Sequence, residues 1–222
     1  MTALLEHLIT VSGSWGARYL LADLPQDSEY LPAFRQADFN IWSRQKILRF
    51  AAGRDHKAEK KYRWRPWANS DVKAMLNLHR AVVPKLFQTI EPQTHQAAIG
   101  MVLYDEHENL LGYADIAFGP MGIWVQPTLA PQTSDAQMLA DLMAEQPDGL
   151  HRPIYLSLRS YQPWLEALAA ELPSADEAER ALLVRYLVLQ EKLPEEAAQP
   201  VYNSNHSESS IPVIQSRHKE EL

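Results

Sequence analysis

The chain has 222 residues, of which 46% are hydrophobic and 22% are charged, and its formal net charge is −7 at pH 7. These are ordinary values for a globular protein of one domain with additional segments. It contains no cysteine, which excludes disulfides, thiolate nucleophiles and cysteine-bound metals. No apolar run reaches about 18 residues and no basic signal peptide is present, so we expect a cytoplasmic protein without a membrane span.

Four elements are expected before residue 52. The first is an amphipathic helix at 2–12, because apolar residues recur on one face at helical spacing, namely Leu4, Leu5, Leu8 and Val11. A short apolar run at 17–24 favours a buried strand. A helix that Asp27 or Ser28 caps and that ends at Arg35 comes next. Residues 39–50 alternate with aromatic and β-branched residues and predict a long strand.

A polar segment at 53–61 separates these elements from a longer unit at 62–191. The first half of this unit is expected to hold an entry strand at 62–67, a helix beginning after Asn69, Ser70 or Asp71, and a hairpin within 97–119. A strand at 122–127 and a helix capped by Ser134 or Asp135 follow. The last three expected elements are a strand at 153–158, a helix at 164–172 and a strand at 179–190. Residues 192–222 are polar and lack periodicity, so we expect a disordered tail.

Two stretches of the chain align with each other without a gap when Tyr19 is placed on Tyr155. The order of short strand, short helix and long strand is the same in both stretches. Six pairs are identical over about 32 positions: Tyr19 and Tyr155, Leu20 and Leu156, Gln26 and Gln162, Ala33 and Ala169, Arg44 and Arg180, and Arg49 and Arg185. This repeat indicates that one whole unit follows the back end of another.

The predicted order of the longer unit is strand, helix, hairpin, strand, helix, strand, helix, strand. Residues 16–50 resemble the back half of the GNAT (GCN5-related N-acetyltransferase) fold, with the turn Ala37-Asp38-Phe39 carrying Asp where the family has Gly. Residues 152–172 resemble the same region in tandem GNAT-like proteins, and residues 64–91 resemble their entry strand and first helix.

The resemblance implies an α/β fold with a GNAT-like mixed sheet flanked by helices. It places a partial back half at 1–52, a linker at 53–61, a complete domain at 62–191 and the tail at 192–222. In this family acetyl-CoA lies in a V between the fourth and fifth strands, and its pyrophosphate is held by the loop (Arg/Gln)-x-x-Gly-x-(Gly/Ala). The amine attacks the thioester, a base removes its proton, and a tyrosine early in the fourth helix often protonates the thiolate.

The cofactor junction of the family corresponds here to GIWVQPTLAPQTSDAQMLADLM, residues 122–143. No glycine lies between Trp124 and Met138, and Pro127 and Pro131 each remove a backbone donor. No Arg or Lys lies between Trp124 and Leu150. Each missing charge-assisted hydrogen bond forgoes about 1.5–3 kcal/mol, so we expect no cofactor, and acetyl-CoA only if catalysis survives.

Two residues are candidates for catalysis. Tyr161 follows the predicted fifth strand, near the position of the family's acid tyrosine, although a tyrosine that packs at a helix start gives the same pattern. Glu91 ends an apolar segment and serves either as a base or as a helix cap.

Candidate binding residues lie on two strands. The backbone of Trp124, Val125 and Gln126 could pair with the pantetheine arm if a cofactor binds. Tyr113 and Asp115 could line an amine pocket, although their alternation with apolar residues also fits a solvent-facing side of a strand.

Other site classes have little support. The eight histidines show no ligand spacing, so no metal is expected. Residues 44–65 hold nine of the 21 Lys and Arg residues, and aromatic residues interleave with them. Single-stranded nucleic acid could bind such a stretch, but in an acidic protein a solvated linker flanked by strand edges is favoured. Its charge could instead dock on the acidic second unit.

The favoured function is therefore a degenerate acetyltransferase relative, a pseudoenzyme that acts as a binding or interaction module for a protein partner. The alternative is an active, acyl-CoA-dependent N-acyltransferase of a small amine with a non-standard cofactor loop. A truncated repeat leaves a strand edge exposed, which favours a homodimer unless the linker covers that edge.

Overall fold

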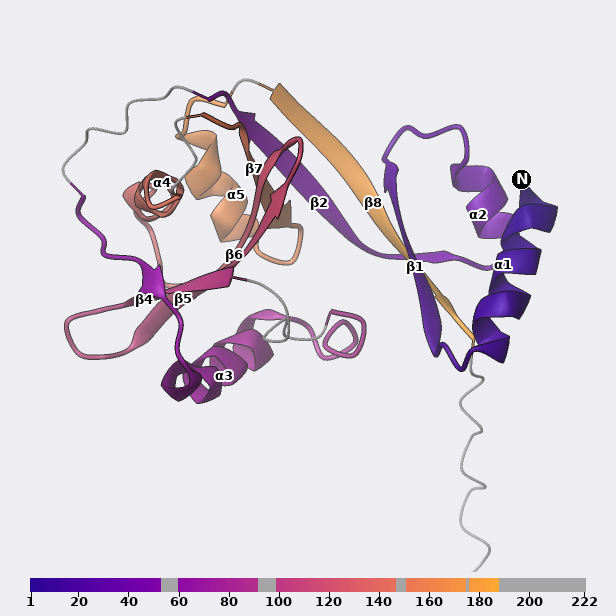
Figure 1. Cartoon of the computed structure of the whole chain (residues 1–222), viewed down its shortest axis with the longest axis horizontal. Coiled ribbons are helices and arrows are strands. Elements are labelled where there is room, and N and C mark those ends of the chain that lie inside the picture. Colours follow the sequence, from indigo (N-terminus) through magenta and orange to yellow (C-terminus); the bar gives the residue numbers. More distant parts are fainter. Residues whose placement is uncertain (53–59, 92–98, 147–150, 175, 188–222) are drawn as a thin grey trace, which may run out of the picture. The chain divides into compact units, whose positions relative to one another are not determined.

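The computed structural model describes residues 1–52, 60–91, 99–146, 151–174 and 176–187. The first four elements are helix α1 (Thr2–Ser14), strand β1 (Tyr19–Pro25), helix α2 (Leu31–Gln36) and strand β2 (Asn40–Phe50) (Figure 1). Helix α1 ends where Gly16 takes a φ of 81°, a left-handed conformation that glycine adopts without strain. The predicted helix and strands of this region are confirmed, but α2 begins at Leu31, three residues after Ser28, because residues 25–30 form a turn instead.

The remaining elements follow the predicted order. They are strand β3 (Arg65–Pro66), the 3₁₀ turn η1 (Asn69–Asp71), helix α3 (Val72–Val82), strands β4 (Ile99–Tyr104), β5 (Leu110–Gly119) and β6 (Gly122–Leu129), helix α4 (Gln137–Ala144), strand β7 (Ile154–Arg159), helix α5 (Pro163–Ala170) and strand β8 (Asp176–Tyr186). Strand β8 begins three residues before the predicted 179, because Asp176 pairs with Arg49 of β2. The predicted tail and residues 53–59 of the predicted linker lie outside the described residues.

All eight strands form one sheet, in the order β1-β8-β2-β7-β6-β5-β4-β3. Every neighbouring pair is antiparallel except β6 and β7, which are parallel. Strand β2 lies between β7 and β8, far along the sequence from both (Figure 1). The predicted segments 1–52 and 62–191 therefore contribute to one sheet, and the mixed α/β fold with flanking helices is the predicted fold class. Whether those ranges are separate domains stays a prediction.

The pairing of β2 with β8 has an internal symmetry. Arg44 pairs with Ala181 and Gln45 pairs with Arg180. The repeat alignment places Arg44 on Arg180 and Gln45 on Ala181, so it exchanges these two pairs. The same alignment maps the bounds of β2, 40–50, onto those of β8, 176–186. A local two-fold axis thus passes through the centre of this antiparallel strand pair.

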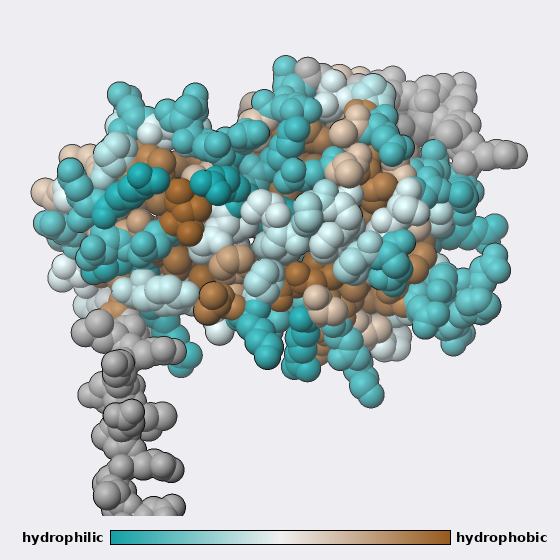
Figure 2. All heavy atoms as spheres, turned by 180° about the vertical axis from the view of Figure 1, so that it is seen from behind, coloured by the Kyte–Doolittle hydropathy of each residue, from teal (hydrophilic) through white to brown (hydrophobic). Residues whose placement is uncertain are grey.

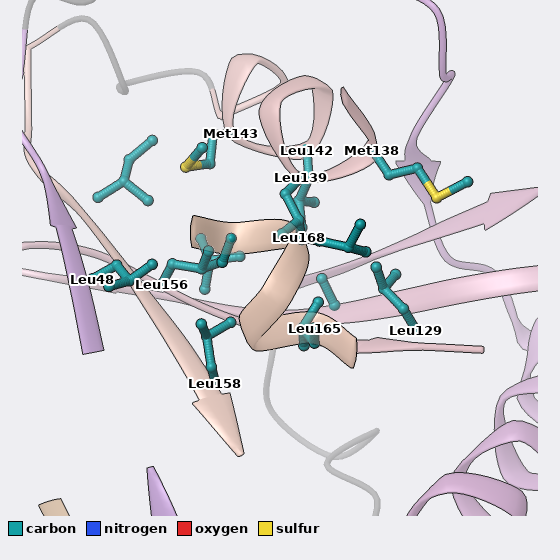
Figure 3. Packing of buried hydrophobic residues seen from close by; sticks show 14 of the residues in the cluster. Leu48, Leu129, Met138, Leu139, Leu142, Met143, Leu156, Leu158, Leu165 and Leu168 are labelled. Atoms are coloured by element: carbon teal, nitrogen blue, oxygen red, sulfur yellow. The ribbon is translucent and has the colours of Figure 1, made fainter. Parts of the chain in front are cut away.

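The helices cover both faces of the sheet. The largest apolar cluster lies where α4 and α5 pack on β2, β5, β6 and β7, with Leu139, Leu156 and Leu165 fully buried (Figure 3). Helix α3 packs on the opposite face through Met75 against Val102 and Tyr113. Helices α1 and α2 pack on β1 and β8 in a separate cluster that includes Leu5, Phe39 and Leu183. In the described part of the chain, no helix combines the length and hydrophobicity needed to cross a membrane.

The turn between α2 and β2 is the predicted Ala37-Asp38-Phe39. Asp38 has a φ of 58°, the left-handed conformation in which the family has glycine, and aspartate is one of the residues that tolerate it. Its carboxylate pairs with Arg185 at 2.8 Å. This ion pair ties the turn to β8.

A charged contact joins β3, β4 and the start of α3. Asp71 is only 3% exposed, and its carboxylate accepts two hydrogen bonds from the Arg65 guanidinium at 2.7 and 2.8 Å. It also accepts bonds from the Ala68 N–H at 2.8 Å and from the Tyr104 hydroxyl at 2.9 Å. The Arg65 guanidinium is the main reason why the pKa of the Asp71 carboxyl lies far below its usual range.

We predict that Asp71→Asn lowers the free energy of unfolding at pH 7 by about 2 kcal/mol, since it removes charge-assisted bonds from a buried position. A carboxylate whose pKa is lowered by folding stabilises the protein above its unfolded pKa of about 4, and this contribution is lost as the pH falls further. Urea unfolding at neutral pH should therefore separate the two proteins more than unfolding at acidic pH, with the exposed Asp27→Asn as control. Equal differences at both pH values would contradict this assignment.

Candidate functional site

The candidate site lies where β6 and β7 separate. These strands pair at Ile123 with Ile154, Trp124 with Tyr155 and Val125 with Leu156, and the pairing ends there. Trp124 and Val125, two of the predicted cofactor-binding residues, are thus held in the sheet between β5 and β7. Strands β6 and β7 separate from Gln126 onward, the last of the three predicted cofactor-binding residues.

The backbone of β6 beyond the last pair is bonded by a side chain. Gln162, which precedes α5, is fully buried. Its Oε1 accepts the Leu129 N–H at 3.2 Å, and its Nε2 donates to the Pro127 carbonyl at 3.3 Å. One primary amide therefore bonds both a donor and an acceptor of β6, as a neighbouring strand would.

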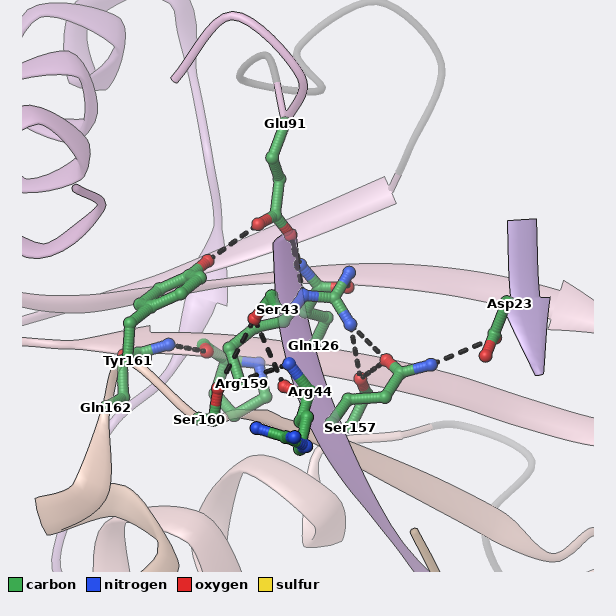
Figure 4. Close-up of polar contacts among 12 residues, drawn as sticks. Asp23, Ser43, Arg44, Glu91, Gln126, Ser157, Arg159, Ser160, Tyr161 and Gln162 are labelled. Carbon is green, nitrogen blue, oxygen red and sulfur yellow. Dashed lines mark hydrogen bonds and ion pairs between the residues drawn. The ribbon is translucent and has the colours of Figure 1, made fainter. Parts of the chain in front are cut away.

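A second group of polar side chains surrounds Glu91. The Glu91 carboxylate accepts hydrogen bonds from Gln126 Nε2 at 2.7 Å, from Arg159 Nε at 2.8 Å and from the Tyr161 hydroxyl at 2.8 Å (Figure 4). Arg159 also donates to Gln126 Oε1 at 3.0 Å. The side chains of Arg159 and Glu91 are only 12% and 13% exposed, so their ion pair is largely shielded from water. Three residues predicted for the site, Tyr161, Glu91 and Gln126, thus meet in one network.

The network continues across the sheet to the N-terminal segment. Gln45 of β2 accepts hydrogen bonds from Arg159 and from the Ser157 hydroxyl, and its Nε2 donates to Asp23 of β1 at 3.0 Å (Figure 4). Ser160 also accepts the Arg44 N–H at 3.2 Å. The polar contacts therefore link four strands, and two of these strands come from the N-terminal segment.

Aromatic rings cover this network on the side of Tyr161. The rings of Phe87 and Tyr161 have centroids 6.2 Å apart, and Phe87 contacts Trp42 of β2 edge to face at 5.3 Å. Burial, followed by the charge of Glu91, raises the pKa of Tyr161 above its usual range. The phenol is thus a hydrogen-bond donor at neutral pH, and a high pKa makes it a poor acid toward a thiolate.

The predicted amine-pocket residues have different surroundings. Tyr113 is 4% exposed and lies in the core beneath α3, where its hydroxyl contacts His79 Nδ1 at 2.9 Å. Burial raises the pKa of Tyr113. Asp115 lies opposite Gln126 in the β5–β6 register, so it shares the sheet face that holds the Glu91 network. The structure thus places both residues on the same sheet face, Asp115 opposite Gln126 and Tyr113 opposite Thr128, with the Tyr113 side chain buried beneath α3.

The start of α4 carries its own carboxylate. Asp135 Oδ1 accepts the Gln137 N–H at 2.9 Å, while Oδ2 accepts bonds from Lys61 Nζ at 2.6 Å and from the Tyr62 hydroxyl at 2.8 Å. Lys60 pairs with Glu145 at the other end of α4 at 2.8 Å. The Lys61 contact is the main cause of the lowered pKa of Asp135.

Lys60 and Lys61 modify the prediction that the loop before α4 lacks positive charge. The loop itself has none, but Lys60 and Lys61 reach it from the segment before β3 and line an open hollow of about 640 Å³ together with Asp135 and Gln137. Both lysines pair with carboxylates at the two ends of α4, as in the alternative in which the linker charge docks on acidic residues of 62–191. Each lysine is paired with a carboxylate, so the hollow gains little net positive charge.

Sequence reasoning missed Gln162, which bonds to β6 in the strand gap, and two members of the polar network beside it. Gln162, Arg159 and Gln45 belong to no catalytic pattern, and their roles depend on strand pairing far apart in the sequence. The alignment of Gln26 with Gln162 is the only signal, and Gln26 is exposed. Within the described ranges, no three His, Asp or Glu side chains are grouped closely enough to hold a metal ion.

No known family model matches the sequence, and a search of curated proteins found no match either. A functionally unknown conserved protein from Staphylococcus epidermidis has a similar structure, with a TM-score of 0.59 at 9% identity over 85% of this chain and 82% of that chain. GCN5-related N-acetyltransferases from Sphaerobacter thermophilus and Kribbella flavida give TM-scores of 0.47 and 0.49 at 9% and 15% identity, over 83% of this chain and 68% and 76% of theirs. At these identities the likeness concerns the fold alone.

We predict that Gln162→Leu lowers the free energy of unfolding by about 1–3 kcal/mol, because it leaves the Leu129 N–H buried without its acceptor. Gln162→Glu should cost at least as much, since a carboxylate cannot donate to the Pro127 carbonyl. Chemical denaturation measures both changes. Gln26→Leu, at the aligned but exposed position, is the matched control, and an equal loss in that variant would refute the special role of Gln162.

Proposed function

We propose that this chain is a GNAT-fold protein whose cofactor gap is closed by its own side chains and which acts as an interaction module in the cytoplasm. The resemblance assigns the fourth and fifth strands of the family to β6 and β7, the parallel pair that separates after Val125. In the family, acetyl-CoA occupies that separation. Here the corresponding groups of β6 are bonded to Gln162.

The contact of Gln162 with β6 is the observation that carries the proposal. A pantetheine arm carries amides that would need the same donor and acceptor of β6. To enter, it would have to displace a fully buried amide and leave that amide without partners, and a buried polar group without its bonds costs about 1–3 kcal/mol. The bound cofactor must offset this cost before any affinity is gained.

The electrostatics at α4 support the same conclusion. An incoming diphosphate would approach the Asp135 carboxylate, which already occupies the first N–H of the helix. It would also compete with Asp135 and Glu145 for Lys61 and Lys60. Like charge next to the phosphates and prior pairing of both lysines weaken anion binding at this helix end.

We further propose that the chain is built from two related parts, a partial unit and a complete one, that exchange their last strands. The elements β1, α2 and β2 correspond to β7, α5 and β8 in the repeat alignment, and β2 pairs with β7 while β8 pairs with β1. This exchange explains why Gln45 and Asp23 of the partial unit complete the polar network of the complete one.

A second function has one observation in its favour. Tyr161 and Glu91, the predicted acid and base, contact each other at 2.8 Å beside the strand gap. An active N-acyltransferase of a small amine with acetyl-CoA as donor could use such a pair. Against it, the two groups are bonded to each other, Glu91 is also paired with Arg159, and the high pKa of Tyr161 makes proton donation unfavourable.

Calorimetric titration of the whole chain tests the proposal. We expect no saturable heat with coenzyme A or acetyl-CoA, and none with pantetheine or adenosine 3′,5′-bisphosphate, which probe the strand gap and the α4 end separately. Micromolar binding of acetyl-CoA with a stoichiometry near one would overturn the proposal.

Turnover with a panel of amines separates the two functions. We expect no acetyl transfer from the wild-type protein. Transfer that disappears in both Glu91→Gln and Tyr161→Phe, while the fold is retained, would establish the enzymatic alternative.

A further inference from the structure

The strand at one end of the sheet has one paired edge and one open edge in the described chain. Strand β1 pairs with β8 along its whole length, from Tyr19 with Tyr186 to Pro25 with Arg180. By contrast β7, its counterpart in the repeat alignment, has neighbours on both sides, β2 and β6. The side of β1 that corresponds to β6 has no strand among the described residues.

The hydrogen bonds show which residues face this open edge. Arg18 accepts the Leu187 N–H at 2.9 Å, and the Gln26 N–H donates to Glu179 at 3.0 Å, so the even-numbered positions at both ends of β1 bond toward β8. Bonding direction alternates along an antiparallel strand. The N–H and C=O groups of Tyr19 and Leu21 and the Asp23 N–H therefore point toward the open edge, whereas the Asp23 carbonyl already accepts a bond from Arg180 at 3.1 Å.

These residues suit pairing with a second copy of themselves. In an antiparallel β1–β1 pair centred on Leu21, the two Leu21 residues lie opposite each other, and Tyr19 of each copy lies opposite Asp23 of the other. The two Asp23 carboxylates therefore do not face each other. Pro25, which lacks an N–H, lies outside this central stretch. Leu21 is 50% exposed, so its side chain is accessible to a partner strand.

Helix α1 offers apolar surface next to the same edge. Leu5 and Ile9 of α1 pack in the cluster that contains Leu20 and Ala22 of β1. A neighbouring stripe of α1 remains at the surface, with Leu4 65%, Leu8 47% and the cap residue Trp15 80% exposed. Figure 2 shows hydrophobic side chains in brown reaching the surface in the part of the molecule that holds α1 and β1.

Symmetry places the two helices together. The dyad of an antiparallel strand pair is perpendicular to the sheet, so both copies of α1 lie on the same face of the joined sheet. Specific interfaces bury about 1,200–2,000 Å² in total, more than a short strand pair provides alone. Burial of the α1 stripes supplies the remaining apolar area, and α1 has only one acidic residue, Glu6, and no Lys or Arg to oppose this contact.

We propose that the open edge of β1 and the exposed stripe of α1 form a two-fold interface between two copies of this chain, centred on Leu21. The sheets of both copies then continue across the interface. This proposal stands apart from the proposed function, because the strand gap takes no part in it and the Glu91 network reaches the interface only through Asp23.

Charge reversal at the dyad tests the proposal. In sedimentation and light scattering at micromolar concentration, we expect the wild-type protein to have twice the chain mass of 25.3 kDa. Leu21→Lys and Leu21→Glu each place like charges against one another and should weaken the dimer by roughly a hundredfold or more. An equimolar mixture of the two variants should recover the dimer.

Met121→Lys, at a residue that is 78% exposed in the β5–β6 turn, is the matched control and should remain dimeric. Circular dichroism and thermal unfolding establish that every variant is folded. A wild-type mass of one chain would overturn the proposal. So would a dimer that persists in both single variants, or a mixture that stays monomeric.

Discussion

The hydrogen bonds of a single buried amide fill the gap between β6 and β7, and the proposed function depends on them. Gln162 bonds to β6 at Leu129 and Pro127, where the sheet would otherwise present unpaired backbone groups to a ligand. Open backbone groups at a strand divergence are what a ligand rich in amides needs. Because the Gln162 side chain bonds these backbone groups, the gap between β6 and β7 is part of the folded core. Its hydrogen bonds therefore contribute to stability.

The polar network beside the closed gap combines residues from two segments of the chain. Its charged centre, Glu91 with Arg159, is contributed by residues that follow β3, whereas Gln45 and Asp23 come from the N-terminal segment. Removing one partner of a shielded ion pair lowers the free energy of unfolding by more than the intact pair contributes to it, because the other charge remains buried. The N-terminal segment is thus tied to the centre of the site by polar bonds as well as by strand pairing.

Much of the fold could be predicted from local patterns, whereas the site could be predicted only in part. The long alternation at 39–50 and the turn at Ala37-Asp38-Phe39 predict β2 correctly, but no local pattern says that β2 lies between β7 and β8. Tyr161 and Glu91 are predictable because catalytic chemistry favours their residue types, whereas Gln126 is predicted for its backbone position in the strand and not for the side-chain contacts it makes. Gln162 is not, because a glutamine acquires this role only when strands far apart in the sequence bring it to Leu129 and Pro127.

The central claim concerns one amide, so it can be tested at that amide by nuclear magnetic resonance. With saturating coenzyme A added to the ¹⁵N-labelled protein, the account predicts that the Leu129 backbone amide and the Gln162 side-chain amide keep their chemical shifts and remain protected from solvent exchange. Large shifts of both resonances, with loss of protection at the Gln162 amide, would show that the ligand displaces it and would contradict the account.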